Sequence, residues 1–540
     1  GEATGTYGFQ VWPAAVEQFP IAFGQTVTNG VPGAGAGNIE TPGAQDVYTF
    51  TAQAGQVVYL EGVEASPSNG NLRWELFGPA GASVNSAWLA GDMGRQRLNE
   101  SGVYRIVVQG DNQATGTYSF KLWSVNDASY PIAMGDTVTN GVPGAGAGVI
   151  EIPGEQDTYT FNAQAGQVVY LEGVDDGNWS YWNLEWVLYS PSGVQLAANY
   201  AAWDIGRQEL KETGLYRIVV YGNSPDTAGG YSFKLLNIED QSFAIVLGDT
   251  VADGVPSAGA GNIETPGAQD FYTFHGQAGQ VVYPQQLGSA ADGNGLWWEL
   301  RDANNNLLVR RGFYDDLDRV SLPAAGTYRI IVGGDTRTVG TYSFTLWEVA
   351  DQSFAIAFGS TVAEGAPGAG AGEIGVPGER DIYTFSAQSG QIGFFELIDS
   401  SVSEGYLWWE LLDPNGVRIA SDYLPQPLGR KQFFQTGTYR IVVHGNLSTT
   451  GTYSFSMRAV EDHSYAVNLG VTVPEGVAGT GAGNIETPGA QDFYTFSAQA
   501  GQIVFLEGME IDESTWNLWW ELVNPSGVRV AYAFLPEGIG

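Results

Sequence analysis

The chain has 540 residues, which is too long for one ordinary domain and predicts roughly three to five of them. Cysteine is absent, so disulfides, thiolate metal sites and cysteine nucleophiles are excluded. The net charge of −37 reflects a shortage of bases, since Lys and Arg total only 22 against 59 Asp and Glu. This balance argues against nucleic acid and anionic membranes as partners, and no apolar run is long enough to span a bilayer.

Four motifs recur with a period close to 111 residues. A Gly-Ala-Gly-Ala-Gly segment, or a close variant of it, begins at Gly33, Gly144, Ser257, Gly368 and Gly479. An Asp-x-Tyr-x-Phe segment, a Tyr-Arg-Ile segment and a Tyr-x-Phe segment recur at the same period. A period of this length fits a whole domain.

Inside each unit, apolar and polar residues alternate, as they do in strands with one buried face. Turns with proline second and glycine fourth separate these segments, for example Gly78-Pro-Ala-Gly81. About seven or eight short strands are expected in each unit. The prediction is therefore an all-β chain of tandem antiparallel jelly-roll-like β-sandwiches of about 111 residues, placed end to end as a rod.

The predicted boundaries follow the repeats. They are 1–12 for the closing strand of a preceding repeat, 13–123 for repeat 1, 124–236 for repeat 2, 237–347 for repeat 3, 348–458 for repeat 4 and 459–540 for an incomplete repeat 5. No Gly/Ser-rich or Pro-rich spacer separates the units. An aromatic residue stands near each junction, which predicts that neighbouring repeats pack on one another through Phe19, Tyr130, Phe243, Phe354 and Tyr465.

One tryptophan recurs in all five units and is predicted to lie in the core. These residues are Trp74, Trp186, Trp298, Trp409 and Trp520. The residue before each of them points to the opposite face and differs between units: Arg73, Glu185, Trp297, Trp408 and Trp519. Function is therefore expected on the outward set.

The order of motifs in one unit resembles the bacterial pre-peptidase C-terminal (PPC) domain family. The matching segments are Gln45-Asp-Val-Tyr-Thr-Phe-Thr-Ala-Gln-Ala-Gly-Gln56, Pro79-Ala-Gly81, Ala325-Gly-Thr-Tyr328 and Gly116-Thr-Tyr-Ser-Phe120. The resemblance covers nearly the whole chain and implies non-catalytic, jelly-roll-like domains of secreted bacterial proteins. The sequence departs from the family pattern where Leu-Trp-Trp-Glu-Leu replaces acidic residues before a strand.

No catalytic site is predicted, and the chain is expected not to be an enzyme. The three histidines, His275, His444 and His463, lie in different units without equivalents in the others. The Gly-Ala-Gly-Ala-Gly segment lacks the lysine and the helix of a phosphate-binding loop, so we interpret it as a tight surface loop or a packing contact with a neighbour.

No cofactor is predicted, with Ca²⁺ as a weak alternative. A Glu and an Asp flank the Pro-Gly turn in three units, but Ca²⁺ prefers six to eight oxygen ligands. The candidate pairs are Glu40 with Asp46, Glu264 with Asp270, and Glu486 with Asp492. An Asp that bonds backbone amides at a strand entry explains the pattern equally well.

Trp297, Trp408 and Trp519 are candidate interface residues. Exposed tryptophans anchor protein interfaces, and they also stack on sugars, so a glycan partner stays open beside self-association. Tyr7, Phe9 and Val11 are further candidates because residues 1–12 match the closing strand Gly116–Leu122. We expect repeat 5 to be completed either by further sequence or by residues 1–12 of another copy.

Together these features favour a non-catalytic extracellular structural protein, a segment or subunit of a bacterial surface filament or stalk. The alternatives are a carbohydrate- or matrix-binding adhesin stalk and a non-catalytic accessory region of a secreted hydrolase.

Overall fold

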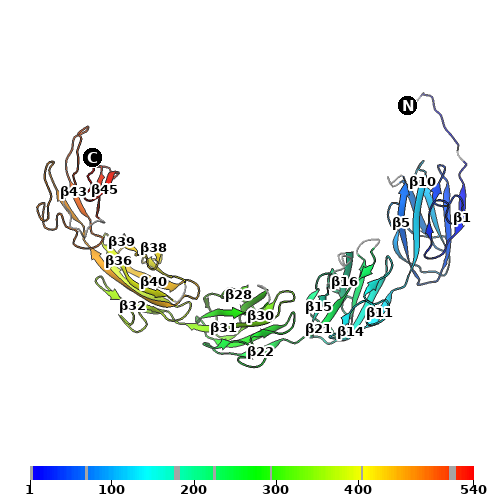
Figure 1. The fold of residues 1–540 in the computed structure, drawn as a ribbon, viewed down its shortest axis with the longest axis horizontal. Coiled ribbons are helices and arrows are strands. Elements are labelled where there is room, and N and C mark those ends of the chain that lie inside the picture. Colours follow the sequence, from blue (N-terminus) through cyan, green and yellow to red (C-terminus); the bar gives the residue numbers. More distant parts are fainter. Residues whose placement is uncertain are drawn as a thin grey trace. The chain divides into compact units, whose positions relative to one another are not determined.

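The computed structural model describes residues 4–11, 13–66, 71–174, 183–222, 227–291, 295–402, 405–509 and 518–540. These residues form strands and turns, and no α-helix occurs among them. The chain divides into two compact units, Gly1–Glu348 and Val349–Gly540. The first contains repeats 1 to 3 and the second contains repeats 4 and 5 (Figure 1).

Repeat 1 shows the strand order that the next three repeats share. Its strands are β1 (Val16–Pro20), β2 (Thr26–Val27), β3 (Asn38–Ile39), β4 (Gln45–Ala52), β5 (Val57–Ser66), β6 (Leu72–Phe77), β7 (Ser83–Trp88), β8 (Gly94–Arg97), β9 (Gly102–Gly110) and β10 (Gly116–Val125). The larger sheet has the order β1-β4-β9-β6-β7, and the smaller has the order β2-β10-β5-β8 with β3 also paired to β10. The chain therefore passes back and forth between two sheets.

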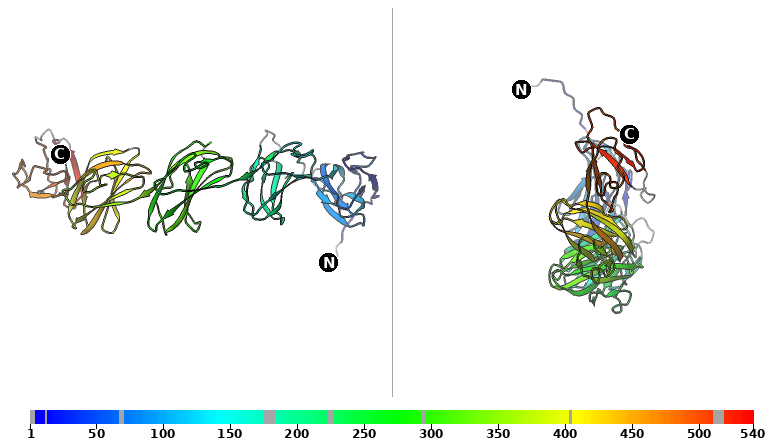
Figure 2. Two further views of the ribbon diagram at one scale, coloured as in Figure 1. Left: turned by 90° about the horizontal axis from the view of Figure 1, so that it is seen from below. Right: turned by 90° about the vertical axis from the view of Figure 1, so that its left-hand side faces the viewer.

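Repeats 2 to 4 keep this strand order, except that one short pair of strands in repeat 2 forms a separate two-stranded sheet. Repeat 2 contains β11 (Ala128–Pro131), β12 (Thr137–Val138), β13 (Val149–Ile150), β14 (Gln156–Ala163), β15 (Val168–Gly173), β16 (Leu184–Tyr189), β17 (Gln195–Tyr200), β18 (Gly206–Glu209), β19 (Gly214–Gly222), β20 (Gly229–Gly230) and β21 (Phe233–Ile238). Repeat 3 contains β22 (Gln241–Ala244), β23 (Thr250–Val251), β24 (Asn262–Ile263), β25 (Gln269–Gly276), β26 (Val281–Ser289), β27 (Leu296–Arg301), β28 (Leu307–Gly312), β29 (Val320–Ser321), β30 (Gly326–Gly334) and β31 (Gly340–Val349). Repeat 4 contains β32 (Gln352–Ala355), β33 (Thr361–Val362), β34 (Glu373–Ile374), β35 (Arg380–Ala387), β36 (Ile392–Val402), β37 (Leu407–Leu412), β38 (Arg418–Tyr423), β39 (Gly429–Gln432), β40 (Gly437–Gly445) and β41 (Gly451–Val460). Every sheet in these repeats is made of strands from one repeat, as Figure 2 shows from two further directions.

The core of each repeat lies between its two sheets. In repeat 3, Trp298 is fully buried, and its ring centroid lies 4.8 Å from that of Phe313 and 5.6 Å from that of Phe344. Its counterparts Trp74, Trp186 and Trp409 are buried to the same degree. The prediction of a recurrent core tryptophan is confirmed in these four repeats.

The predicted fold class, tandem antiparallel jelly-roll-like β-sandwiches placed end to end as a rod, is wrong in the form stated. The larger sheet of each repeat is mixed, because its first strand runs parallel to the second, as β1 does to β4 from Val16 opposite Gln45 to Pro20 opposite Thr49. The compact units are also two rather than five separate beads. Apolar alternation could not reveal the parallel strand, since strands of either direction alternate alike. The all-β, tandemly repeated character of the chain is confirmed.

Repeat 5 forms fewer strand pairs than the others. β42 (His463–Ala466) pairs in parallel with β43 (Asp492–Thr495), and β44 (Trp519–Val523) pairs with β45 (Arg529–Phe534). The described residues of this repeat contain no counterpart of β9, the strand that lies between β4 and β6 in repeat 1. Phe505 is 70% exposed, whereas its counterpart Tyr59, which packs on Gly154 of repeat 2, is 5% exposed.

Candidate functional site: buried carboxyl groups and contacts between repeats

A buried carboxyl group lies between two tyrosines in each of the first four repeats. In repeat 3, the hydroxyl groups of Tyr272 and Tyr342 both donate to Oδ2 of Asp270 and lie 2.8 Å from each other. The backbone N–H of Gly261 donates to the Tyr272 hydroxyl at 2.8 Å. This network joins β25, β31 and the glycine-rich loop around one carboxyl group.

A similar network recurs at equivalent positions, and in repeat 2 it joins Tyr159 to Tyr231 and Tyr231 to Asp157. Its members are Asp46, Tyr48 and Tyr118; Asp157, Tyr159 and Tyr231; and Asp381, Tyr383 and Tyr453. Burial is the main cause that raises the pKa of Asp46 to about 6 and the pKa of Asp157, Asp270 and Asp381 to about 7. Oδ1 of Asp157 and of Asp381 is buried without a hydrogen-bond partner, which suits a protonated carboxyl group better than a carboxylate.

This network changes how two sequence motifs are understood. In the predicted calcium pairs, the aspartate accepts hydrogen bonds from tyrosine hydroxyls, as Asp46 does from Tyr118. Asp46 is buried, whereas its predicted partner Glu40 is exposed. No group of three or more metal-ligating side chains occurs among the described residues. The glycine-rich loop packs inside its own repeat rather than on a neighbour. A Cβ at Gly37 would lie 2.3 Å from the carbonyl carbon of Thr28, so glycine is required there.

An arginine of one repeat binds an aspartate and a backbone carbonyl of the next. Arg207, in β18 of repeat 2, donates to both carboxylate oxygens of Asp240 at 2.8 and 2.6 Å and to the carbonyl of Gly267 at 2.7 Å. The Asp240 carboxylate also accepts from the N–H of Gln269 at 3.0 Å. We call this bidentate arrangement the Arg–Asp joint, and its planar geometry fixes direction as well as distance.

The Arg–Asp joint also links repeats 1 and 2 and, within the second compact unit, repeats 4 and 5. The corresponding groups are Arg95, Asp127 and Gly154, and Arg430, Asp462 and Gly489. Their side chains are one-fifth to one-third exposed, so solvent weakens these pairs less than it weakens fully exposed ones.

An aromatic ring packs on the glycine of each of these joints. A Cβ at Gly154 would lie 2.3 Å from Cδ2 of Tyr59, and Gly154 has a φ of +80°. Tyr170 contacts Gly267 and Phe394 contacts Gly489 in the same way. By contrast, the aromatics predicted to pack between repeats stay inside their own repeat, as Tyr130 does by stacking on Tyr159 at 5.3 Å. That part of the sequence prediction is wrong because the residues are inner members of the parallel strand.

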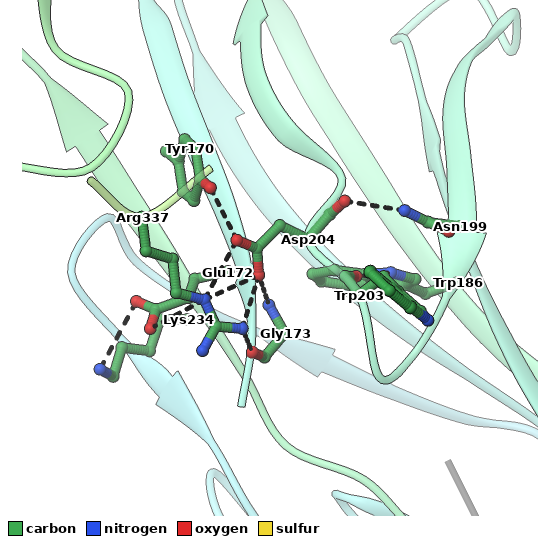
Figure 3. Close-up of polar contacts among 9 residues, drawn as sticks. All are labelled: Tyr170, Glu172, Gly173, Trp186, Asn199, Trp203, Asp204, Lys234 and Arg337. Atoms are coloured by element: carbon green, nitrogen blue, oxygen red, sulfur yellow. Dashed lines mark hydrogen bonds and ion pairs between the residues drawn. The ribbon is translucent and has the colours of Figure 1, made fainter. Parts of the chain in front are cut away.

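The contact between repeats 2 and 3 contains an additional arginine (Figure 3). Arg337, in the loop between β30 and β31, donates to Asp204 at 2.7 Å and to the carbonyl of Gly173. It also lies 3.7 Å from Glu172, which pairs with Lys234 at 3.5 Å. The hydrogen bond to Asp204 is the main cause that raises the pKa of Arg337.

Asp204 also binds Tyr170, the aromatic residue that packs on Gly267 at the Arg–Asp joint. The Tyr170 hydroxyl donates to it at 2.6 Å and the Gly173 N–H at 2.9 Å, as Figure 3 shows. Arg337 therefore connects repeat 3 to the same group of repeat 2 that orients Tyr170 against Gly267. The equivalent of Arg337 is Gln113 in repeat 1 and Ser448 in repeat 4, and neither side chain carries a charge.

The predicted interface residues lie in different surroundings. Trp297 packs under Arg310, whose guanidinium carbon is 4.0 Å from the ring centroid. Trp408 lies beside Tyr423, and Trp519 is 50% exposed. Tyr7, Phe9 and Val11 are 80–90% exposed and form no strand.

Each of the three histidines has contacts within its own repeat. His275 contacts Thr327, His444 contacts the Gly445 carbonyl, and His463 lies near Glu486 and Asp492. In the part of the chain that the structure describes, no helix has the length and apolar character needed to cross a membrane.

Comparison with known proteins leaves the family open. No protein-family model and no curated protein sequence matches the chain. Among solved structures, a lysozyme inhibitor, PliG of Aeromonas hydrophila, is 17% identical with a TM-score of 0.17, over 21% of this chain and 98% of its own. The CUB1-EGF-CUB2 region of human MASP-1/3 is 8% identical with a TM-score of 0.16, over 39% of this chain and 99% of its own. These similarities are too weak to carry an argument, and the resemblance to the PPC family stays a prediction.

The Arg–Asp joint could have been found in the sequence. Arg95, Arg207 and Arg430 recur at the repeat period in a chain with very few bases, and so do Asp127, Asp240 and Asp462. The recurrence of arginine, a rare residue in this chain, was the feature of the sequence that indicated the joint.

Replacing Gly154 by alanine is expected to open the joint between repeats 1 and 2. The new Cβ would collide with Tyr59, and the positive φ adds strain of roughly 1–2 kcal/mol. Hydrogen exchange of the Gln156 N–H, which donates to Asp127, should become about tenfold faster.

Gly43→Ala is the matched control. Gly43 occupies the same motif position in repeat 1 with a φ of +84°, but its Cβ would meet only the Ala14 methyl group at 3.7 Å. Equal acceleration at Gln156 in both variants would show that the Tyr59 contact does not hold the joint.

Proposed function

We propose that this chain is a non-catalytic structural segment of an extracellular bacterial surface filament or stalk. The recurrent Arg–Asp joint is the observation that carries the proposal. A bidentate pair, a shared carbonyl and a ring packed on glycine oppose free rotation between neighbouring repeats. Such contacts suit a structural chain in which neighbouring repeats must keep a fixed spacing and orientation.

The distribution of chemistry supports the same proposal. The recurrent carboxyl groups lie inside the core, where tyrosines bind them, or at the joints, where arginines bind them. What recurs is thus structural, whereas the outer faces differ between repeats.

Immunogold labelling of intact cells that carry the sequence tests the proposal. Antibodies against the chain should label fibres or stalks outside the cell, and external protease should remove the label. Label confined to the cytoplasm would refute the proposed function.

A further inference from the structure

One cross-strand row on the outer face of the larger sheet differs in every repeat. The row runs across four paired strands, one residue from each. It reads Gln45, Gln109, Arg73 and Trp88 in repeat 1; Gln156, Tyr221, Glu185 and Tyr200 in repeat 2; Gln269, Gly333, Trp297 and Gly312 in repeat 3; and Arg380, His444, Trp408 and Tyr423 in repeat 4.

In repeats 1 and 3, the side chains of the row form hydrogen bonds or packing contacts within their own sheet. The side chains of Gln45 and Gln109 form a hydrogen bond at 2.7 Å. Trp297 packs over Gly333, where a Cβ would lie 2.6 Å from the indole ring, and Arg310 covers it. The repeat 3 tryptophan is therefore committed to contacts within its own sheet.

In repeat 4, Trp408 and Tyr423 of the row form a cluster of aromatic rings with the neighbouring Tyr406 on the outer face of the sheet. The ring of Tyr423 lies 6.1 Å from that of Trp408 and 5.4 Å from that of Tyr406, with angles of 64° and 66° between the planes. Tyr406 is 55% exposed and Tyr423 38% exposed. Neither Tyr406 nor His444 has a counterpart in repeat 3, where Gly295 and Gly333 stand. We call Tyr406, Trp408 and Tyr423 the aromatic row.

Hydrogen-bonding groups border the aromatic row. His444 donates from Nδ1 to the Gly445 carbonyl in the tautomer that leaves Nε2 as an acceptor. Arg380 pairs across the sheet with His444, and Glu410, one pleat along β37 from Trp408, is held by Arg418 at 2.8 Å. The surface thus combines ring faces with donors and acceptors along one line.

We propose that the aromatic row of repeat 4 binds a single chain of a neutral polysaccharide. Sugar rings present C–H faces that stack on aromatic side chains and hydroxyl groups that bond to flanking polar groups. The cross-strand row of repeat 4, which contains Trp408 and Tyr423 together with His444 and Arg380, crosses four strands and spans about 14 Å, the length of a short oligosaccharide. The net charge of −37 disfavours acidic polysaccharides.

The angles between the rings restrict further which kind of polysaccharide can bind. A flat crystalline polysaccharide face requires coplanar aromatic rings, whereas these planes are inclined by more than 60°. A free chain can turn successive sugars to meet such rings. A protein partner fits less well, because a stable interface buries roughly 800 Å² on each side around an apolar centre, and here charged residues flank a single row.

The test measures binding of soluble probes to the whole chain by isothermal titration calorimetry. The probes are the hexasaccharides of β-1,4-glucose, β-1,3-glucose, β-1,4-xylose and β-1,4-N-acetylglucosamine, with polygalacturonate as the acidic probe and crystalline cellulose as the flat surface. At least one neutral hexasaccharide should bind, and Trp408→Ala should weaken it about tenfold or more. Trp408→Phe, which keeps a ring, should retain most of the affinity.

Trp297→Ala is the matched control, since it removes the equivalent residue of repeat 3 and should leave the affinity unchanged. Unaltered circular dichroism of each variant excludes loss of fold. The proposal is overturned if no neutral probe binds, if only polygalacturonate or crystalline cellulose binds, or if Trp297→Ala weakens binding as much as Trp408→Ala. These outcomes are independent of the immunogold result.

Discussion

Replacing Trp298 by alanine should lower the free energy of unfolding of repeat 3 by about 3–5 kcal/mol. The indole is fully buried between Phe313 and Phe344, and its Nε1–H donates to the Asp315 carbonyl at 3.0 Å. The substitution would leave a cavity at the centre of the two-sheet core and remove this hydrogen bond. Chemical denaturation followed by fluorescence measures the change.

Trp297→Ala serves as the control for this prediction. Trp297 is the chain neighbour of Trp298 but lies on the outer face, half-buried under Arg310. We expect a cost below about 1.5 kcal/mol, in the range of one lost cation–π contact and part of one ring's burial. Equal costs for the two variants would contradict the assignment of inner and outer faces.

The second large effect is a gain of stability on acidification. The pKa of Asp157, Asp270 and Asp381 is raised to about 7 and that of Asp46 to about 6, against an ordinary value of 3.8, chiefly by burial. The folded state therefore holds these protons more tightly than the unfolded chain does. The stabilisation is complete below about pH 4 and is lost as the pH rises through 6 to 7.

Thermal unfolding at pH 5 and pH 8 measures this dependence. The expected difference is on the order of 3 kcal/mol for repeats 2 to 4 and about half of that for repeat 1, since one pKa unit corresponds to about 1.4 kcal/mol. Replacing all four aspartates by asparagine, which keeps an acceptor for the tyrosine hydroxyls, should flatten the dependence. A thermal midpoint that is lower at pH 5 than at pH 8 would contradict protonation of the buried aspartates.

The sequence allowed the repeats and their inner faces to be predicted, but not the partners of individual side chains. Apolar alternation identified Trp298 as inner and Trp297 as outer, because adjacent residues of a strand point to opposite faces. It did not reveal that β1 is parallel to β4, or that Asp46 accepts from Tyr118, 72 residues later. Such pairings depend on strand order, which a repeat pattern does not encode.

The candidate site was recoverable only in part for a similar reason. The outward tryptophans were correctly singled out as variable, yet Trp297 and Trp408 look equivalent in sequence. Their surroundings differ because β28 and β30 place Gly312 and Gly333 beside Trp297, whereas β38 and β40 place Tyr423 and His444 beside Trp408. Cross-strand neighbours decide whether a ring is covered or presented.

The central claim, that the Arg–Asp joint fixes neighbouring repeats to each other, is tested most directly by electron–electron distance measurement between two spin labels. The chain has no cysteine, so Thr51→Cys and Asn162→Cys, at equivalent exposed positions of repeats 1 and 2, provide unique attachment points. A narrow distance distribution is predicted, and Asp127→Ala should broaden it severalfold by releasing Arg95. A distribution that is broad from the outset, and that Asp127→Ala leaves unchanged, would contradict the account.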